Sequence, residues 1–393
     1  MTYRAPLSEI EFTLGRIIGA DRLSETARFA EATPDMRAAI LAEAGRMAEN
    51  ALAPLQREGD LHPARLENGV TRASPGFAEG FAAIASGGWI GIAAEPEHGG
   101  MGLPLTFGTV VNEMMASACL SLSLCSLMSQ GQIEALEHHA SDEIKSLYLP
   151  KLISGEWTGT MNLTEAQAGS DVGALRTKAE PLGDGTYALT GQKIFITWGD
   201  NDFAKNVCHL VLARLPGAPA GTKGLSLFLA PKLLPDADGR PGAANSLKVV
   251  SLEHKLGIHG SPTAVMAYEG AKAWLIGAEG GGIAAMFTMM NNARLGVATE
   301  GLGVAEAATQ KALAYAMERK QGRSPTGETG AIIDHADVRR MLMRMKALTF
   351  VSRAICLDTA FSLDMGRAGD EGARASWAAR GAFLTPIAKA FST

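Results

Sequence analysis

Met161–Lys178 reads Met-Asn-Leu-Thr-Glu-Ala-Gln-Ala-Gly-Ser-Asp-Val-Gly-Ala-Leu-Arg-Thr-Lys, and this segment restricts fold and function more than any other part of the chain. It combines short hydroxyl side chains, glycines and two acidic residues, which is a composition typical of a loop. Hydroxyls and exposed backbone N–H groups can donate hydrogen bonds to a ligand without covering its face. The segment therefore predicts either a ligand-binding loop or a hairpin whose threonines and glycines serve only the turns.

A second segment follows shortly afterwards. Gly191–Gly199 reads Gly-Gln-Lys-Ile-Phe-Ile-Thr-Trp-Gly and predicts a strand that ends in a hydroxyl and an aromatic residue. Side chains two residues apart in a strand lie on the same face. Phe195 and Thr197 are therefore expected to share one face, where a ring and a hydroxyl could meet one ligand.

Together the two segments resemble the acyl-CoA dehydrogenase family. Leu163–Asp171 matches the family pattern Leu-Thr-Glu-x-x-Ala-Gly-Ser-Asp, and Gly191–Thr197 matches Gly-x-Lys-x-(aromatic)-Ile-Thr. Most relatives have Pro where this chain has Ala166. The branch that includes the 3-methylmercaptopropionyl-CoA dehydrogenases resembles this chain at that position, and the resemblance extends over essentially the whole sequence.

This resemblance implies that the chain binds FAD. Thr164 would hydrogen-bond the flavin ring, and Gly169 and Ser170 would lie near the flavin phosphates and the acyl-CoA. Phe195 would pack on the flavin, and Thr197 would reach the edge of the ring that accepts hydride. The residues implied to bind the cofactor in these two segments are Met161, Leu163, Thr164, Gly169, Ser170, Phe195 and Thr197.

Two arginines in a later helical stretch complete the implied site. Arg319, in Tyr-Ala-Met-Glu-Arg-Lys, would bind the flavin diphosphate of a neighbouring subunit, because a guanidinium forms paired hydrogen bonds with phosphates. The chain would then be a homodimer or homotetramer. The Phe that usually follows in the family is absent, and a solvated helix C-terminus is the alternative. Arg294 would contact the CoA thioester together with Ser170; its alternative is a core helix with one snorkelling arginine.

The base that such a reaction requires is not apparent. Removing the weakly acidic α-proton of an acyl-CoA needs a desolvated carboxylate. The family's usual Tyr-Glu-Gly-Thr segment does not occur here, and Tyr268-Glu269 is followed by Gly-Ala in a β region. One branch places the base directly before the residue that matches Arg294, where this chain has Ala293. We expect no catalytic residue in the chain, with the Glu beyond Thr393 of a longer protein; the alternative is a member that naturally lacks it.

The texture of the sequence changes twice. Apolar residues at helical spacing mark residues 1 to 157, and short apolar runs between Gly, Pro, Asn and Asp mark 158 to 276. Helical spacing returns from 277 to 393. With the resemblance, this order predicts an N-terminal all-α domain, a middle antiparallel β-barrel domain and an incomplete C-terminal helical bundle.

Composition excludes several classes of protein. The 393 residues carry a net charge of −5, which argues against a nucleic-acid-binding surface. We see no signal peptide and no apolar stretch that could insert into a membrane. The cysteines have mostly apolar neighbours, which is typical of free thiols in the cytoplasm. We expect no metal site, because the histidines are isolated or suit solvated ion pairs. The residues concerned are Cys119, Cys125, Cys208, Cys356, His138, His139, His254 and His259.

The resemblance thus implies an FAD-dependent oxidoreductase of fatty acid or sulfur metabolism. It would form the α,β double bond of an acyl-CoA, for which 3-methylmercaptopropionyl-CoA is one candidate. Electrons would pass to an electron-transfer flavoprotein. The alternatives are a non-catalytic flavin-binding member of the fold and an acyl-CoA oxidase, in which oxygen reaches the reduced flavin.

Overall fold

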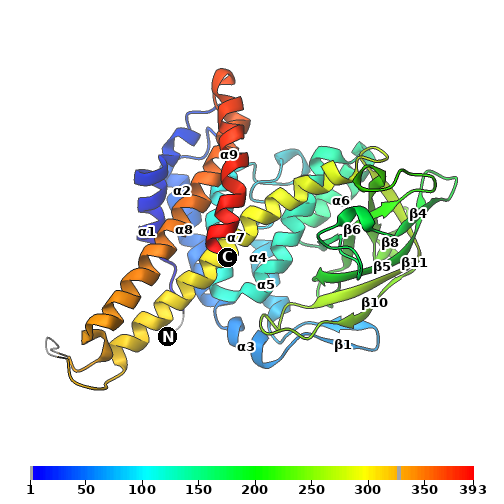
Figure 1. The fold of residues 1–393 in the computed structure, drawn as a ribbon. Helices are drawn as coiled ribbons and strands as arrows, with labels where there is room; N and C mark the ends of the chain where they lie inside the picture. The colour runs from blue at the N-terminus through cyan, green and yellow to red at the C-terminus, as the bar shows by residue number, and fades with distance from the viewer. Residues whose placement is uncertain (1–2, 325–328) are drawn as a thin grey trace. The chain divides into compact units, whose positions relative to one another are not determined.

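A computed structural model describes residues 3–324 and 329–393 (Figure 1). By their contacts these residues form two compact units, each described here by itself. The sheet unit comprises Leu55–Gly102 and Ser121–Ala293, and the helical unit comprises Met1–Pro54, Leu103–Leu120 and Arg294–Thr393. The predicted order of helical, sheet-rich and again helical segments is confirmed.

The sheet unit contains a seven-stranded sheet in the order β10-β11-β5-β4-β6-β3, with β7 paired to both β11 and β6. Its strands are β3 (Trp157–Asn162), β4 (Lys178–Pro181), β5 (Tyr187–Thr197), β6 (Asn206–Arg214), β7 (Leu225–Pro231), β10 (Leu247–Leu252) and β11 (Thr263–Ile276). The strands β3 and β4 both meet β6 in parallel. The sheet is therefore mixed, and the predicted antiparallel barrel is corrected in this respect. Turn residues between short apolar runs show where the chain reverses, but they do not show which strands pair.

Burial explains the positions of these strands. Nearly every residue of β6 and all of β7 are buried, which agrees with their predominantly apolar sequences. Val211 and Phe228 of these strands lie in the unit's core with Leu189 of β5 and Tyr268 of β11. The strand β5 instead alternates between buried and exposed positions until Lys193, after which the alternation breaks.

The sheet unit also contains short elements that the sequence did not predict. These are two hairpins: β1 (Arg65–Glu67) with β2 (Val70–Arg72) precedes the main sheet in sequence, and β8 (Leu233–Pro235) with β9 (Pro241–Ala244) lies between its strands β7 and β10. The first of them interrupts the segment that was expected to be all-α. It was not predicted, because strands of three residues are too short to show a period in the sequence. The helices and 3-10 turns within this unit are α3 (Leu55–Leu61), α4 (Phe77–Ser86), η4 (Pro96–His98), α6 (Asp142–Ile153), η5 (Val172–Ala174) and η6 (Thr222–Gly224).

Two long helices contribute residues to both units. These are α5 (Leu105–His139) and α7 (Gly282–Glu318). The backbone of α5 is not helical at Cys119, close to the point where the division between the units falls. An 18-residue window of α5 has a mean hydropathy of 1.4, so its length and composition would suit a membrane span, which the sequence analysis did not expect. Because 89% of that window is buried within the structure, the same hydropathy also fits a core helix.

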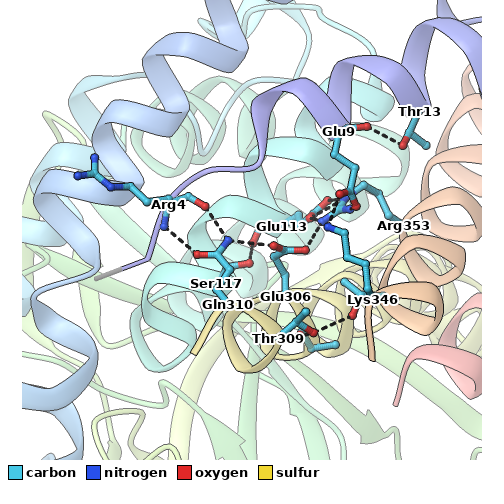
Figure 2. Close-up of polar contacts among 12 residues, drawn as sticks. Arg4, Glu9, Thr13, Glu113, Ser117, Glu306, Thr309, Gln310, Lys346 and Arg353 are labelled. Atoms are coloured by element: carbon cyan, nitrogen blue, oxygen red, sulfur yellow. Dashed lines mark hydrogen bonds and ion pairs between the residues drawn. The ribbon is translucent and has the colours of Figure 1, made fainter. Parts of the chain in front are cut away.

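The helical unit is built around a buried group of charges. Arg353 of α8 is fully buried, and its guanidinium lies 2.6 Å from Glu113 and 2.8 Å from Glu306, and also pairs with Glu9 (Figure 2). Lys346 pairs with the same Glu9. Burial raises the pKa of Glu113, although Arg353 opposes this shift. The group joins α1, α5, α7 and α8. The remaining elements of this unit are α1 (Leu7–Phe12), η1 (Thr13–Ile18), η2 (Ala20–Leu23), α2 (Pro34–Met47), η3 (Ala48–Leu52), η7 (Ile332–Asp334), α8 (Ala336–Ala368) and α9 (Glu371–Ser392).

Candidate functional site

The loop that follows β3 is held against β5. The amide of Ile194 donates to the carbonyl oxygen of Thr164 at 2.9 Å. One residue earlier on each segment, the ammonium of Lys193 donates to the carbonyl oxygen of Leu163, also at 2.9 Å. The loop closes on itself through two backbone hydrogen bonds between Glu165 and Ala168. These contacts place the first predicted segment alongside the second.

An ion pair lies beneath this loop. Lys193 is fully buried, and its ammonium lies 2.9 Å from the carboxylate of Glu165, whose side chain is 5% exposed. Although burial alone would raise the pKa of Glu165, the charge of Lys193 and hydrogen bonds from Thr177 and Arg176 lower it to about 2. Burial lowers the pKa of Lys193 to about 8, although Glu165 opposes this shift.

The end of β5 has an unusual backbone. Phe195 has a φ of 62° and Trp198 a φ of 53°, which is the left-handed region that bulky residues rarely adopt. The pairing of β5 with β11 slips between Lys193 and Ile196, as in a β-bulge. Lys193 and Ile196 are consequently both buried, whereas Phe195 remains 58% exposed. A large, exposed and strained aromatic residue of this kind is typical of a functional position.

Several polar groups of the two segments have no hydrogen-bond partner within the protein. Across the part of the chain that the structure describes, the hydroxyls of Thr164, Ser170 and Thr197 make no hydrogen bond, and all three are at least partly exposed. A Cβ atom at Gly169 would meet only ordinary contact, 3.5 Å from Thr164. The protein's own packing therefore does not require these residues, whereas a ligand that accepts hydrogen bonds would use them.

The structure brings together only part of the predicted site. One group lies in or beside the sheet unit's β3 and β5, and its members are Met161, Leu163, Thr164, Gly169, Ser170, Phe195 and Thr197. Arg294 and Arg319 belong to the helical unit, so the structure does not join them to this group. Arg294 is half-buried on α7, and Arg319 is exposed just after α7 and donates to Gln321 at 3.1 Å.

The sequence analysis missed the residues that support this site. Glu165 and Lys193 both belong to the quoted patterns, but they received no role there. One signal was available, because Lys193 directly precedes the apolar run 194–196 in a predicted strand, and a buried lysine needs a partner. The strain at Trp198 had no such signal. Its indole is fully buried and donates to the carbonyl oxygen of Ser121 at 3.0 Å.

Comparison with known proteins adds three kinds of similarity. Models of the acyl-CoA dehydrogenase N-terminal, middle and C-terminal domains match residues 34–156, 160–271 and 280–380. The chain is 45% identical over 396 residues to 3-methylmercaptopropionyl-CoA dehydrogenase of Ruegeria pomeroyi, an alignment that covers 100% of this chain and 67% of that protein. It is 39% identical to a butyryl-CoA dehydrogenase of Syntrophomonas wolfei over 74% of this chain and 50% of that protein.

The fold has similar solved structures as well. Butyryl-CoA dehydrogenase from Megasphaera elsdenii superposes with a TM-score of 0.72 at 24% identity, covering 90% of this chain and 85% of that one. The chain spans about two thirds of the length of the Ruegeria protein and about half of the Syntrophomonas protein.

Proposed function

Because the chain belongs to the acyl-CoA dehydrogenase family, we propose that it forms the flavin-binding side of an enzyme that introduces an α,β double bond into an acyl-CoA thioester. The observation that carries this proposal is the loop at Thr164, fixed against β5 with its hydroxyl unpartnered, beside the strained and exposed ring of Phe195. The loop provides hydrogen-bond donors, and β5 provides an apolar surface.

The residues present suit FAD. When bound, FAD supplies an acceptor for the hydride that leaves the β-carbon of the thioester. The hydroxyls of Thr164 and Thr197 would donate to the polar edge of the ring, and Phe195 would cover part of one face. Ser170 and the bare backbone at Gly169 would meet phosphate groups and the acyl-CoA. Met161 and Leu163 would line the ring from β3 and from the loop that follows it.

The two arginines extend this proposal to a second subunit and to the substrate. We assign Arg319 to the flavin diphosphate of a neighbouring subunit and Arg294 to the CoA thioester, as the family resemblance implies. The substrate class is an acyl-CoA, and the 45% identity to the Ruegeria protein favours 3-methylmercaptopropionyl-CoA among its members. An electron-transfer flavoprotein in the cytoplasm is the proposed electron acceptor.

We infer that the proton acceptor is not one of the residues around the flavin loop. Ala293, directly before Arg294, has no ionisable group. Glu269, which follows Tyr268, lies on β11, is exposed and pairs with Lys248 at 2.7 Å, so it has none of the desolvation that a base of this kind requires.

Anaerobic mixing of the FAD-loaded chain with 3-methylmercaptopropionyl-CoA or butyryl-CoA tests the proposal. We expect the visible flavin spectrum to shift on binding, with little bleaching because we propose that the chain lacks the family's usual base. A spectrum that does not respond to either thioester would contradict the substrate site. Rapid bleaching would contradict the missing base, and oxygen consumption in air would identify an oxidase instead.

A further inference from the structure

The contacts of Lys193 reach from the core of the sheet unit to the loop that we assign to the flavin. Its ammonium donates to the carbonyl oxygen of Leu163 and to Glu165, both at 2.9 Å. The next residue, Ile194, uses its amide to hold the carbonyl oxygen of Thr164. Two successive residues of β5 thus hold two successive carbonyl groups of the loop, one through a side chain and one through the backbone.

Glu165 secures the other end of this arrangement. One of its oxygens accepts from the amide of Thr177 at 3.0 Å and from its hydroxyl at 2.6 Å. The other accepts from the amide of Arg176 at 2.7 Å and from the side chain of Gln167 at 2.6 Å. The carboxylate therefore ties the start of the loop to its end, and it does so while charged.

Stability alone does not account for a charged pair at this place. Buried ion pairs contribute little to stability compared with apolar residues of similar volume, because both charges must be desolvated. What this pair provides is a fixed position for the backbone of Leu163. The same strand segment carries the bulge that turns Lys193 inward and leaves Phe195 exposed one position beyond Ile194.

We infer that Lys193 and Glu165 are positioning residues for the cofactor, which hold the loop at Leu163 and Thr164 in the conformation that receives the flavin. This inference rests on the proposed function, because it takes the loop to be the flavin-binding segment. It assigns no contact with the flavin to either side chain. Their effect passes through the loop backbone alone.

The test compares two ion pairs in the same unit, of which the control has one buried partner. Lys193→Met/Glu165→Gln removes both charges of the positioning pair, so neither charge is left buried without its counter-ion. The matched control is Lys232→Met/Asp200→Asn, which removes an ion pair with a separation of 2.6 Å and a buried Asp200. Neither residue of this pair contacts the loop at Leu163. Each full-length variant is titrated with FAD by quenching of flavin fluorescence, and the visible spectrum of the bound flavin is recorded.

We expect the positioning variant to bind FAD about tenfold to a hundredfold more weakly, which corresponds to one lost charge-assisted hydrogen bond. The spectrum of its bound flavin should also change, which a merely structural role would not cause. The control variant should bind FAD as the wild type does, even if its melting temperature falls. A positioning variant with wild-type affinity and spectrum would overturn the inference.

A second variant keeps the test decisive if the first does not fold. Lys193→Met alone removes the ammonium from the loop but leaves the carboxylate of Glu165 with its hydrogen bonds from Thr177 and Arg176, and an unchanged affinity for FAD would then refute the inference. If the wild-type chain itself binds no FAD, the proposed function fails, and this inference falls with it. The two failures are therefore distinguished by the wild-type titration.

Discussion

At the scale of single residues, backbone strain is the most informative feature of the site. Phe195 adopts φ 62° although it is neither glycine nor asparagine, and its side chain gains little from burial. Residues held in such sparsely populated regions cost about 1–3 kcal/mol. The strain therefore indicates that this ring position serves a ligand rather than the stability of the fold.

Phe195→Gly separates the cost of the backbone strain from the contribution of the ring to FAD binding. Glycine adopts positive φ without steric cost, so the free energy of unfolding of the apoprotein should stay the same or rise by about 1 kcal/mol, while FAD binds more weakly. Urea unfolding and FAD titration measure the two effects. Thr190→Gly, at an exposed position of the same strand without positive φ, is the control and should lose about 0.5–1 kcal/mol. If Phe195→Gly lowered the free energy of unfolding as much as the control does, this interpretation of the strain would be contradicted.

The ionised Glu165 predicts a pH dependence of stability. Its pKa is lowered from 4.5 to about 2 on folding, so the unfolded chain binds the proton more readily between these values. The stabilisation that is linked to this shift is therefore complete above pH 4.5 and is lost as pH falls towards 2. Urea unfolding of wild type and Glu165→Gln should show a difference at pH 6 that shrinks at pH 3. A difference that is constant over this range would argue against the pair as described.

The sequence named candidate residues for the site but did not indicate their conformations. The hydroxyls and glycines of Met161–Lys178 predicted either a ligand loop or a plain hairpin, and among the described residues the hydroxyls of Thr164 and Ser170 have no hydrogen-bond partner. The positive φ at Phe195 and Trp198 was not predictable, because tertiary contacts impose it on residues that normally avoid it. The partnership of Lys193 with Glu165 spans a loop and a strand, so it depends on pairing that no local pattern shows.

At the scale of elements, the mixed sheet and the charge group of the helical unit have the same origin. Both depend on contacts between segments that are distant in sequence. The strand β3 pairs in parallel with β6 although β4 and β5 lie between them in the chain. Arg353 and Glu9 are separated by most of the sequence, and no local sequence pattern near either residue predicts that they pair.

Arg353→Met tests how strongly that group stabilises the helical unit. The change leaves the buried carboxylates of Glu113 and Glu306 without their shared cation, so the free energy of unfolding should fall by about 3–5 kcal/mol. Arg340→Met breaks an exposed pair with Asp337 on the same helix and should cost about 0.5 kcal/mol. Urea unfolding of both variants gives the comparison. Equal losses of unfolding free energy would show that the buried charges stabilise the unit no more than an exposed ion pair does.

At the scale of the whole molecule, the role proposed for Arg319 makes the chain one subunit of a flavoprotein assembly. Arg319 lies in the helical unit and is exposed, and its guanidinium donates to nearby Gln321. If it reaches a neighbour's flavin, FAD and subunit contacts depend on one another. Sedimentation of the FAD-bound chain should then give a dimer or larger species, and Arg319→Ala should weaken both FAD retention and assembly. A monomer that retains FAD would refute this role.

The central claim is that the loop at Thr164 and the end of β5 bind FAD. Equilibrium titration of the apoprotein with FAD, followed by the quenching of flavin fluorescence, tests it most directly. The account predicts saturable binding of one FAD per chain, weakened when Thr164 and Thr197 are both replaced by Val. Flavin fluorescence that stays unquenched at excess protein, or an affinity for FAD that both substitutions leave unchanged, would contradict it.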